Sequence, residues 1–125
     1  MRILAVDDDD SLLGAVELML KRHGHDVEAA GSAREALECV KTGSYDFVLL
    51  DYKMPEEDGI WFMEQAELPR DTKVLLTTAY ANRAMIQRIF ELGAVGYIVK
   101  PFSEEDILHH LEFHSRPQPP PTTTI

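Results

Sequence analysis

The chain alternates short, continuous apolar runs with stretches that show the apolar periodicity of a helix. Strand-length runs without polar alternation are typical of a sheet that is covered on both faces. Such sheets are parallel, and their right-handed crossover connections place helices on both sides. The sequence therefore predicts an α/β fold with a doubly wound, five-stranded parallel sheet. The strands are expected at residues 3–6, 26–30, 47–50, 74–77 and 97–99.

Five amphipathic stretches follow these strands and are predicted to be helices. Ser32 and Glu35 form a capping box before the second stretch, and Ser103 and Asp106 form another before the last. A glycine follows the first and the fourth stretch, at the position where glycine commonly ends a helix. The helices are expected at about residues 12–20, 33–40, 59–67, 82–92 and 104–115.

The last ten residues, 116–125, are rich in proline and threonine, unlike the rest of the chain. Such a composition cannot pack a core and is typical of an extended or flexible segment. A length of 125 residues suffices for one cored domain but not for two of ordinary size. We therefore expect one domain over residues 1–115 and a Pro/Thr-rich flexible tail or linker over residues 116–125. A linker to a further domain is favoured over a tail that simply ends.

The formal net charge of −10 argues against several classes of partner. It repels nucleic acids and anionic membrane surfaces, and it favours cations or basic protein faces. No apolar run approaches the roughly 20 residues that span a bilayer, and the N-terminus does not resemble a signal peptide. The single cysteine, Cys39, cannot form an internal disulfide, which fits a reducing compartment. We therefore expect a cytoplasmic protein with no membrane segment and no direct nucleic acid contact.

Polar residues stand at the carboxyl ends of the predicted strands. The first strand ends in Asp7 and Asp8, the third in Asp51, the fourth in Thr78 and the fifth in Lys100. In open α/β sheets, functional groups gather at the carboxyl ends of the strands. Three carboxylates, one hydroxyl and one ammonium group are therefore expected to meet in a single crevice.

The chemistry of this set points to phosphoryl transfer. Three close carboxylates repel one another and need a cation to remain ionised together. Oxygen ligands without His or Cys favour Mg²⁺, which would hold a phosphoryl group near Asp51. Lys100 would pair with one phosphoryl oxygen, and Thr78 would donate a hydrogen bond to another. A carboxylate is a known acceptor of a phosphoryl group in covalent catalysis.

A set of short motifs resembles the receiver family, the phosphoacceptor domains of response regulators in two-component signal transduction. Each motif is weak alone, but together, in order and at this spacing, they are specific. The resemblance covers residues 2 to about 115 and implies a flavodoxin-like (βα)5 fold with strand order 2-1-3-4-5. The motifs are Val6–Asp9, Leu49–Pro55 followed by Asp58–Gly59, Thr78–Ala79, Gly93–Ala94 and Gly96–Phe102.

The resemblance implies a role for each residue of the predicted site. Asp51 resembles the phosphoacceptor. Asp8 and Asp51 resemble direct Mg²⁺ ligands together with the backbone carbonyl of Lys53, and Asp7 resembles a residue that acts mainly through water. Lys100 resembles the lysine that pairs with the phosphate.

Further positions resemble the switch of the family. Thr78 resembles the hydroxyl that moves toward the phosphoryl group, and Tyr97 the aromatic that turns inward with it. The Lys100–Pro101 bond resembles a cis peptide that aims the lysine into the pocket. Lys53 and Tyr80 match positions that tune dephosphorylation, and their bulk predicts slow loss of the phosphoryl group.

The implied function is that of a signalling domain and not of an enzyme. A sensor histidine kinase or a phosphotransfer protein would donate the phosphoryl group. The switched face, made of the fourth helix, the fifth strand and the fifth helix, would then control an output domain or an effector protein. A homodimer that forms on phosphorylation is a further partner state that the resemblance allows.

Two alternatives compete with this interpretation. A phosphatase of similar fold needs a second acidic residue, two positions after the nucleophile, as its general acid–base. This chain has Lys53 at that position. A degenerate receiver would bind partners without phosphorylation, which the complete set of Asp8, Asp51, Thr78 and Lys100 argues against.

Two other features suggest little on their own. Trp61 is expected to be partly packed, with a partner contact as the alternative. His110 and His114 lie one helical turn apart and are interpreted as a solvated helix face, because metal binding needs more ligands.

Overall fold

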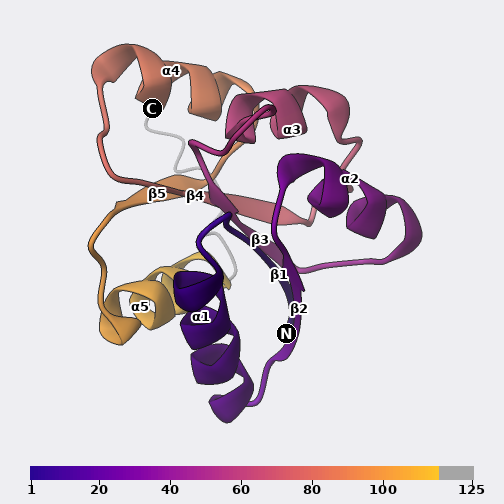
Figure 1. Ribbon diagram of the computed structural model, residues 1–125, viewed down its shortest axis with the longest axis vertical. Helices are drawn as coiled ribbons and strands as arrows, with labels where there is room; N and C mark the ends of the chain where they lie inside the picture. Colours follow the sequence, from indigo (N-terminus) through magenta and orange to yellow (C-terminus); the bar gives the residue numbers. More distant parts are fainter. Residues whose placement is uncertain (116–125) are drawn as a thin grey trace, which may run out of the picture.

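The computed structural model describes residues 1–115, and within them the chain forms one sheet with helices on both faces (Figure 1). The strands run parallel in the order 2-1-3-4-5, which confirms the predicted doubly wound fold. The predicted tail at residues 116–125 lies outside the described residues. The strands are β1 (Arg2–Val6), β2 (Asp26–Ala30), β3 (Phe47–Asp51), β4 (Lys73–Thr78) and β5 (Gly96–Val99).

Side-chain caps begin the helices. Asp9, Ser32, Asp58 and Asn82 each accept a hydrogen bond from a backbone N–H in the first turn of the helix that follows. The third helix ends earlier than predicted, because Ala66 already has an extended backbone. The helices are α1 (Asp10–Arg22), α2 (Ala33–Thr42), α3 (Gly59–Gln65), α4 (Arg83–Glu91) and α5 (Glu104–Ser115).

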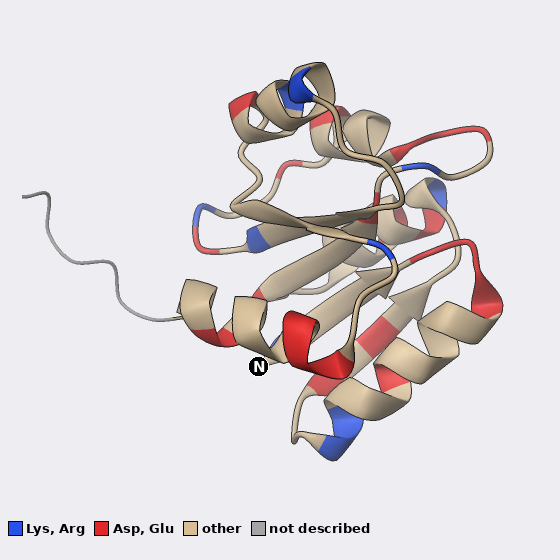
Figure 2. Cartoon of the chain, turned by 90° about the vertical axis from the view of Figure 1, so that its left-hand side faces the viewer, with Lys and Arg blue, Asp and Glu red and all other residues tan. Residues whose placement is uncertain are grey.

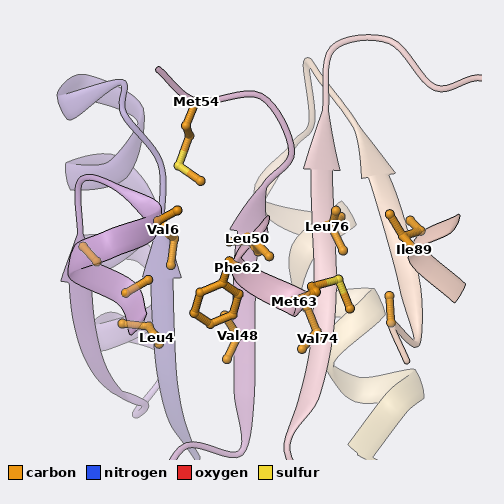
Figure 3. Packing of buried hydrophobic residues seen from close by; sticks show 14 of the residues in the cluster. Leu4, Val6, Val48, Leu50, Met54, Phe62, Met63, Val74, Leu76 and Ile89 are labelled. Carbon is orange, nitrogen blue, oxygen red and sulfur yellow. The ribbon is translucent and has the colours of Figure 1, made fainter. Parts of the chain in front are cut away.

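Two apolar layers hold the helices to the sheet. Because side chains alternate along a strand, Leu4 and Val6 of β1 face one layer, whereas Ile3 and Ala5 face the other. The first layer lies under α2, α3 and α4, with Phe62 of α3 packed against the strands (Figure 3). The second layer lies under α1 and α5. Both faces of the sheet are thus covered, as the continuous apolar runs predict.

The register of the strands brings their carboxyl ends to one edge. Val6 pairs with Leu50, so the residues that follow β1 lie beside the end of β3. Thr78 pairs with Val99, so the residue after β5 lies beside the end of β4. This edge carries the polar residues on which the functional prediction rests.

Candidate functional site

Two buried aspartates lie side by side at this edge. Asp51 is the last residue of β3 and is 4% exposed, and Asp7 directly follows β1 and is 6% exposed. Asp8 is exposed, and one carboxylate oxygen from each of the three residues lies within 4.8 Å of the others. The structure therefore brings the predicted carboxylates together.

Lys100 reaches this cluster from the end of β5. Its ammonium nitrogen, Nζ, donates to Asp7 Oδ2 at 2.8 Å and to Asp51 Oδ1 at 3.1 Å. The Lys100–Pro101 peptide bond is cis, as the family resemblance implies. One lysine thus supplies the positive charge for two buried carboxylates.

The protonation of the pair reflects this shared charge. Burial, and after it the negative charge of Asp7, raises the pKa of Asp51 from its ordinary 3.8 to about 6, even though Lys100 acts to lower it. Burial is the largest influence on the pKa of Lys100 and lowers it, but the hydrogen bonds and charges of Asp7 and Asp51 outweigh it. The net pKa of Lys100 is raised. The raised pKa of Asp51 means that Lys100 alone does not balance the buried negative charge.

A hard divalent cation fits the donor set at this edge. The side chains that converge offer carboxylate oxygens without His or Cys, which is the chemistry that Mg²⁺ prefers. The loop after β3, which carries the Lys53 carbonyl, is the remaining predicted source of a ligand. Among residues 1–115, no other group of three His, Cys, Asp or Glu side chains comes as close together.

Thr78 lies at the same edge, but its hydroxyl is engaged elsewhere. The residue ends β4 and is 3% exposed. Its Oγ1 donates to the backbone carbonyl of Tyr80 at 3.0 Å and accepts from the backbone N–H of Tyr80 at 3.2 Å. Its backbone carbonyl accepts from the N–H of Lys100 at 2.7 Å. The Thr78 hydroxyl, which the sequence predicts to donate to a phosphoryl oxygen, is therefore bonded here to the backbone of the loop after β4.

The remaining predicted residues surround this cluster without joining it. Tyr97 on β5 is half-buried, and its ring packs edge-to-face against Phe90 of α4. The side chains of Lys53 and Tyr80 are exposed, that of Tyr80 by 76%. The described residues show neither of these two side chains in a hydrogen bond with Asp51.

Gly59, the first residue of α3, is a site position whose role the sequence did not reveal. A Cβ atom there would lie 3.0 Å from the carbonyl oxygen of Asp51 and 3.2 Å from the Cα of Tyr52. The backbone N–H of Gly59 also donates to the carbonyl of Tyr52 at 2.8 Å. The helix start therefore packs directly against the strand end that carries Asp51. The Asp58–Gly59 pair was visible in the sequence, but the close approach required coordinates.

Trp61 and the pair of His110 and His114, which the sequence did not link to a function, are all partly buried. Trp61 is half-buried, and the Arg34 guanidinium lies 5.2 Å from its ring centre, so partial packing describes it. His110 and His114 are also half-buried with stacked rings, and burial lowers the pKa of both. The prediction of a solvated face was wrong for this pair, because both side chains are half-buried, and Gly96 of β5 leaves room for the His114 ring.

Comparison with known proteins gives a consistent family. Residues 3–112 match the response regulator receiver domain. The transcriptional regulatory protein PdtaR of Mycobacterium tuberculosis is 31% identical over 112 residues, which cover 89% of this chain and 55% of PdtaR. A CheY-like receiver domain protein from Methanospirillum hungatei has a TM-score of 0.86 at 32% identity, covering 90% of each chain. The non-phosphorylated HemR receiver domain from Leptospira biflexa has a TM-score of 0.85 at 32% identity, covering 97% of this chain and 98% of that domain.

The chain belongs to the response regulator receiver family, the signalling domains of two-component systems. It spans about half the length of the curated relatives that it matches. None of the helices in residues 1–115 is long and apolar enough to cross a membrane.

Proposed function

We propose that Asp51 accepts a phosphoryl group from a sensor histidine kinase or a phosphotransfer protein, in a step that requires Mg²⁺. The observation that carries this proposal is the buried Asp7–Asp51–Lys100 cluster. Its carboxylates are held 2.8 and 3.1 Å from one ammonium nitrogen at the edge where three strands end. No other arrangement of ionisable groups in the described chain combines burial with an unbalanced negative charge in this way.

The transfer itself is a substitution at phosphorus. A carboxylate oxygen of Asp51 forms the new P–O bond as the P–N bond to the donor histidine breaks, and the donor imidazole keeps the electron pair. Mg²⁺ bound by Asp7, Asp8, Asp51 and the Lys53 carbonyl would neutralise charge on the phosphoryl oxygens. Lys100 then moves its hydrogen bond from the Asp51 carboxylate to a phosphoryl oxygen. Mg²⁺ would thus supply the positive charge that the pocket otherwise lacks and that the incoming phosphoryl oxygens require.

The signal would leave the site through Thr78. A phosphoryl oxygen is a stronger acceptor than the Tyr80 carbonyl, because it is ionised. The Thr78 hydroxyl would therefore exchange its partner and release the loop that leads to α4. Tyr97 would turn inward behind it, and the face formed by α4, β5 and α5 would change. This change would control an output domain or effector protein, and a homodimer formed on phosphorylation is one way to do so.

We further propose that residues 1–115 are the receiver domain and residues 116–125 a linker. Several relatives are named transcriptional regulatory proteins, and a transcriptional output would fit them. The net charge of −10 argues against direct nucleic acid binding by this domain, so the output would act through another domain or partner. A cytoplasmic location follows from this role.

Binding of beryllofluoride, which imitates a phosphoryl group on a carboxylate, tests the proposal. With Mg²⁺ present, we expect a saturable change in Trp61 fluorescence and a rise in the unfolding temperature. Asp51→Asn should abolish both, and Asp8→Asn should require much more Mg²⁺. A wild-type protein that gives no response, or the same response as Asp51→Asn, would instead support a degenerate receiver that acts without phosphorylation.

A further inference from the structure

Phe90 places an aromatic ring against the proposed switch residue. The ring centres of Phe90 and Tyr97 lie 6.5 Å apart and their planes meet at 76°, which is an edge-to-face pair. Phe90 is 45% exposed, although it belongs to a helix whose buried face is made by Met85 and Ile89. The core therefore does not require an aromatic residue at this position.

The same segment of chain holds both switch residues. The backbone of Tyr80, just before α4, makes two hydrogen bonds with the Thr78 hydroxyl, and Phe90, near the end of α4, contacts Tyr97. A salt bridge of 2.9 Å between the Arg88 guanidinium and the Glu64 carboxylate links α4 to α3. Movement of α4 would consequently change the surroundings of Thr78 and Tyr97 together.

We propose that Phe90 is a positioning residue that holds Tyr97 in its half-buried place and so opposes the switched conformation. The inference rests on the proposed function, because it assigns a cost to the inward turn of Tyr97. An inward turn takes the tyrosine ring away from α4 and breaks the edge-to-face contact. Aromatic pairs of this kind change an equilibrium by about two- to tenfold. Phe90 thus sets how strong a phosphoryl signal the domain needs.

The effect of Phe90 on the equilibrium between the two conformations should appear as a change in the apparent affinity for beryllofluoride. If the switched state binds beryllofluoride better, the apparent affinity falls with the fraction of molecules that remain unswitched. Removing a contact that exists only in the unswitched state therefore raises the apparent affinity by up to the same factor. A general loss of stability, without a bias between the two states, leaves the midpoint unchanged.

Three variants isolate the ring contact. Phe90→Leu keeps an apolar side chain without the ring, and Phe90→Tyr keeps the ring. Phe113→Leu deletes a 56% exposed ring on α5 that packs edge-to-face against His114 and not against Tyr97. We expect Phe90→Leu to lower the midpoint of a Mg²⁺–beryllofluoride titration by about two- to tenfold, and the other two to match the wild type. The NMR signals of the Tyr97 ring, without ligand, should move in Phe90→Leu and not in Phe113→Leu. Phe90→Met provides a second variant without the ring if Phe90→Leu unfolds.

The outcome separates this inference from the proposed function. A wild-type protein that binds beryllofluoride, together with an unchanged or raised midpoint in Phe90→Leu and Phe90→Met, overturns the role of Phe90 alone. A lowered midpoint in Phe113→Leu also overturns it, because the effect would then not depend on Tyr97. A wild-type protein that does not respond to beryllofluoride overturns the phosphoacceptor proposal itself.

Discussion

At the scale of single residues, the Asp51 carboxyl group shares the ammonium nitrogen of Lys100 with the carboxyl group of Asp7. Burial removes the water that would otherwise stabilise its ionised form, and the pKa rises to about 6. Above that pH, and without a bound cation, the folded protein carries a buried charge that is only partly balanced. The site thus costs stability where its chemistry requires an ionised carboxylate.

The first prediction concerns Asp51→Asn in the absence of Mg²⁺. The pKa of Asp51 is higher in the folded protein than in the unfolded chain. Protonated Asp51 therefore stabilises the folded protein fully below a pH of about 4, and this stabilisation is lost as the pH rises through about 6. At neutral pH the variant should exceed the wild type by on the order of 2 kcal/mol in free energy of unfolding. Urea titrations between pH 4 and 7.5, roughly the span of this ionisation, measure the difference. A difference that does not grow with pH would contradict the raised pKa.

A second prediction concerns the lifetime of the phosphorylated form. Tyr80 lies two residues beyond Thr78, and its exposed side chain is not held by the core. If it covers the phosphoryl group and excludes water, the acyl phosphate should persist for minutes or longer, and Tyr80→Ala should shorten that time several-fold. The decay of phosphorylated protein after removal of the donor gives both values. A wild-type half-life of seconds would remove the basis for slow dephosphorylation.

The sequence predicted which polar side chains meet at the strand ends, but not the contacts that they make there. Asp7, Asp51 and Lys100 could be predicted to meet, because the ends of parallel strands share one edge. The hydrogen bonds of Thr78 to the Tyr80 backbone could not, because they depend on the conformation of a loop. The contact of Phe90 with Tyr97 depends likewise on how α4 packs.

At the scale of elements, the close approach of α3 to β3 fixes the position of the strand end. A methyl group at position 59 would meet backbone atoms of Asp51 and Tyr52 at 3.0 and 3.2 Å, and neither can move without displacing the site. We predict that Gly59→Ala destabilises the protein by about 1–3 kcal/mol and weakens beryllofluoride binding.

Gly14→Ala is the matched control for this substitution. Gly14 lies in the exposed part of α1, with no atom within 4 Å of an added Cβ, so alanine should stabilise the helix by about 0.5–1 kcal/mol. Urea unfolding of both variants gives the comparison. Equal effects of the two substitutions would argue against a packing role for Gly59.

Element type was easier to predict than element ends. Continuous apolar runs identify β1 and β3, and capping side chains identify the starts of α2 and α5, because both signals are local. The end of α3 was placed two residues too far along the chain, since the extended backbone of Ala66 has no clear local signal. The exposure of His114 was misjudged because its ring lies against Gly96, a glycine in another element.

At the scale of the whole molecule, the acidic surface is broad. Asp and Glu outnumber Lys and Arg in the sequence, and they occur in the helices on both faces of the sheet (Figure 2). With a net charge of −10, such a surface favours basic partner faces and cations. Association with a kinase or phosphotransfer protein should therefore slow as salt concentration rises.

The proposed domain boundary makes a further prediction at this scale. If residues 1–115 form the complete folding unit, a chain that ends at Ser115 should keep the unfolding temperature and the beryllofluoride response of the full chain. Thermal unfolding of both proteins, with and without Mg²⁺, measures this. A clear loss of stability on truncation would place residues 116–125 within the domain.

The most direct test of the phosphoacceptor assignment is the intact mass of the protein after incubation with acetyl phosphate and Mg²⁺. We predict a gain of one phosphoryl group that hydroxylamine removes, as it does from acyl phosphates, and that chelation of Mg²⁺ prevents. The gain should be absent from Asp51→Asn and retained in a matched Asp46→Asn variant. Asp46 lies just before β3, and its carboxylate accepts a hydrogen bond from the backbone N–H of Arg2. An unchanged mass in the wild type, or an equal gain in Asp51→Asn, would contradict the assignment of Asp51 as the phosphoacceptor.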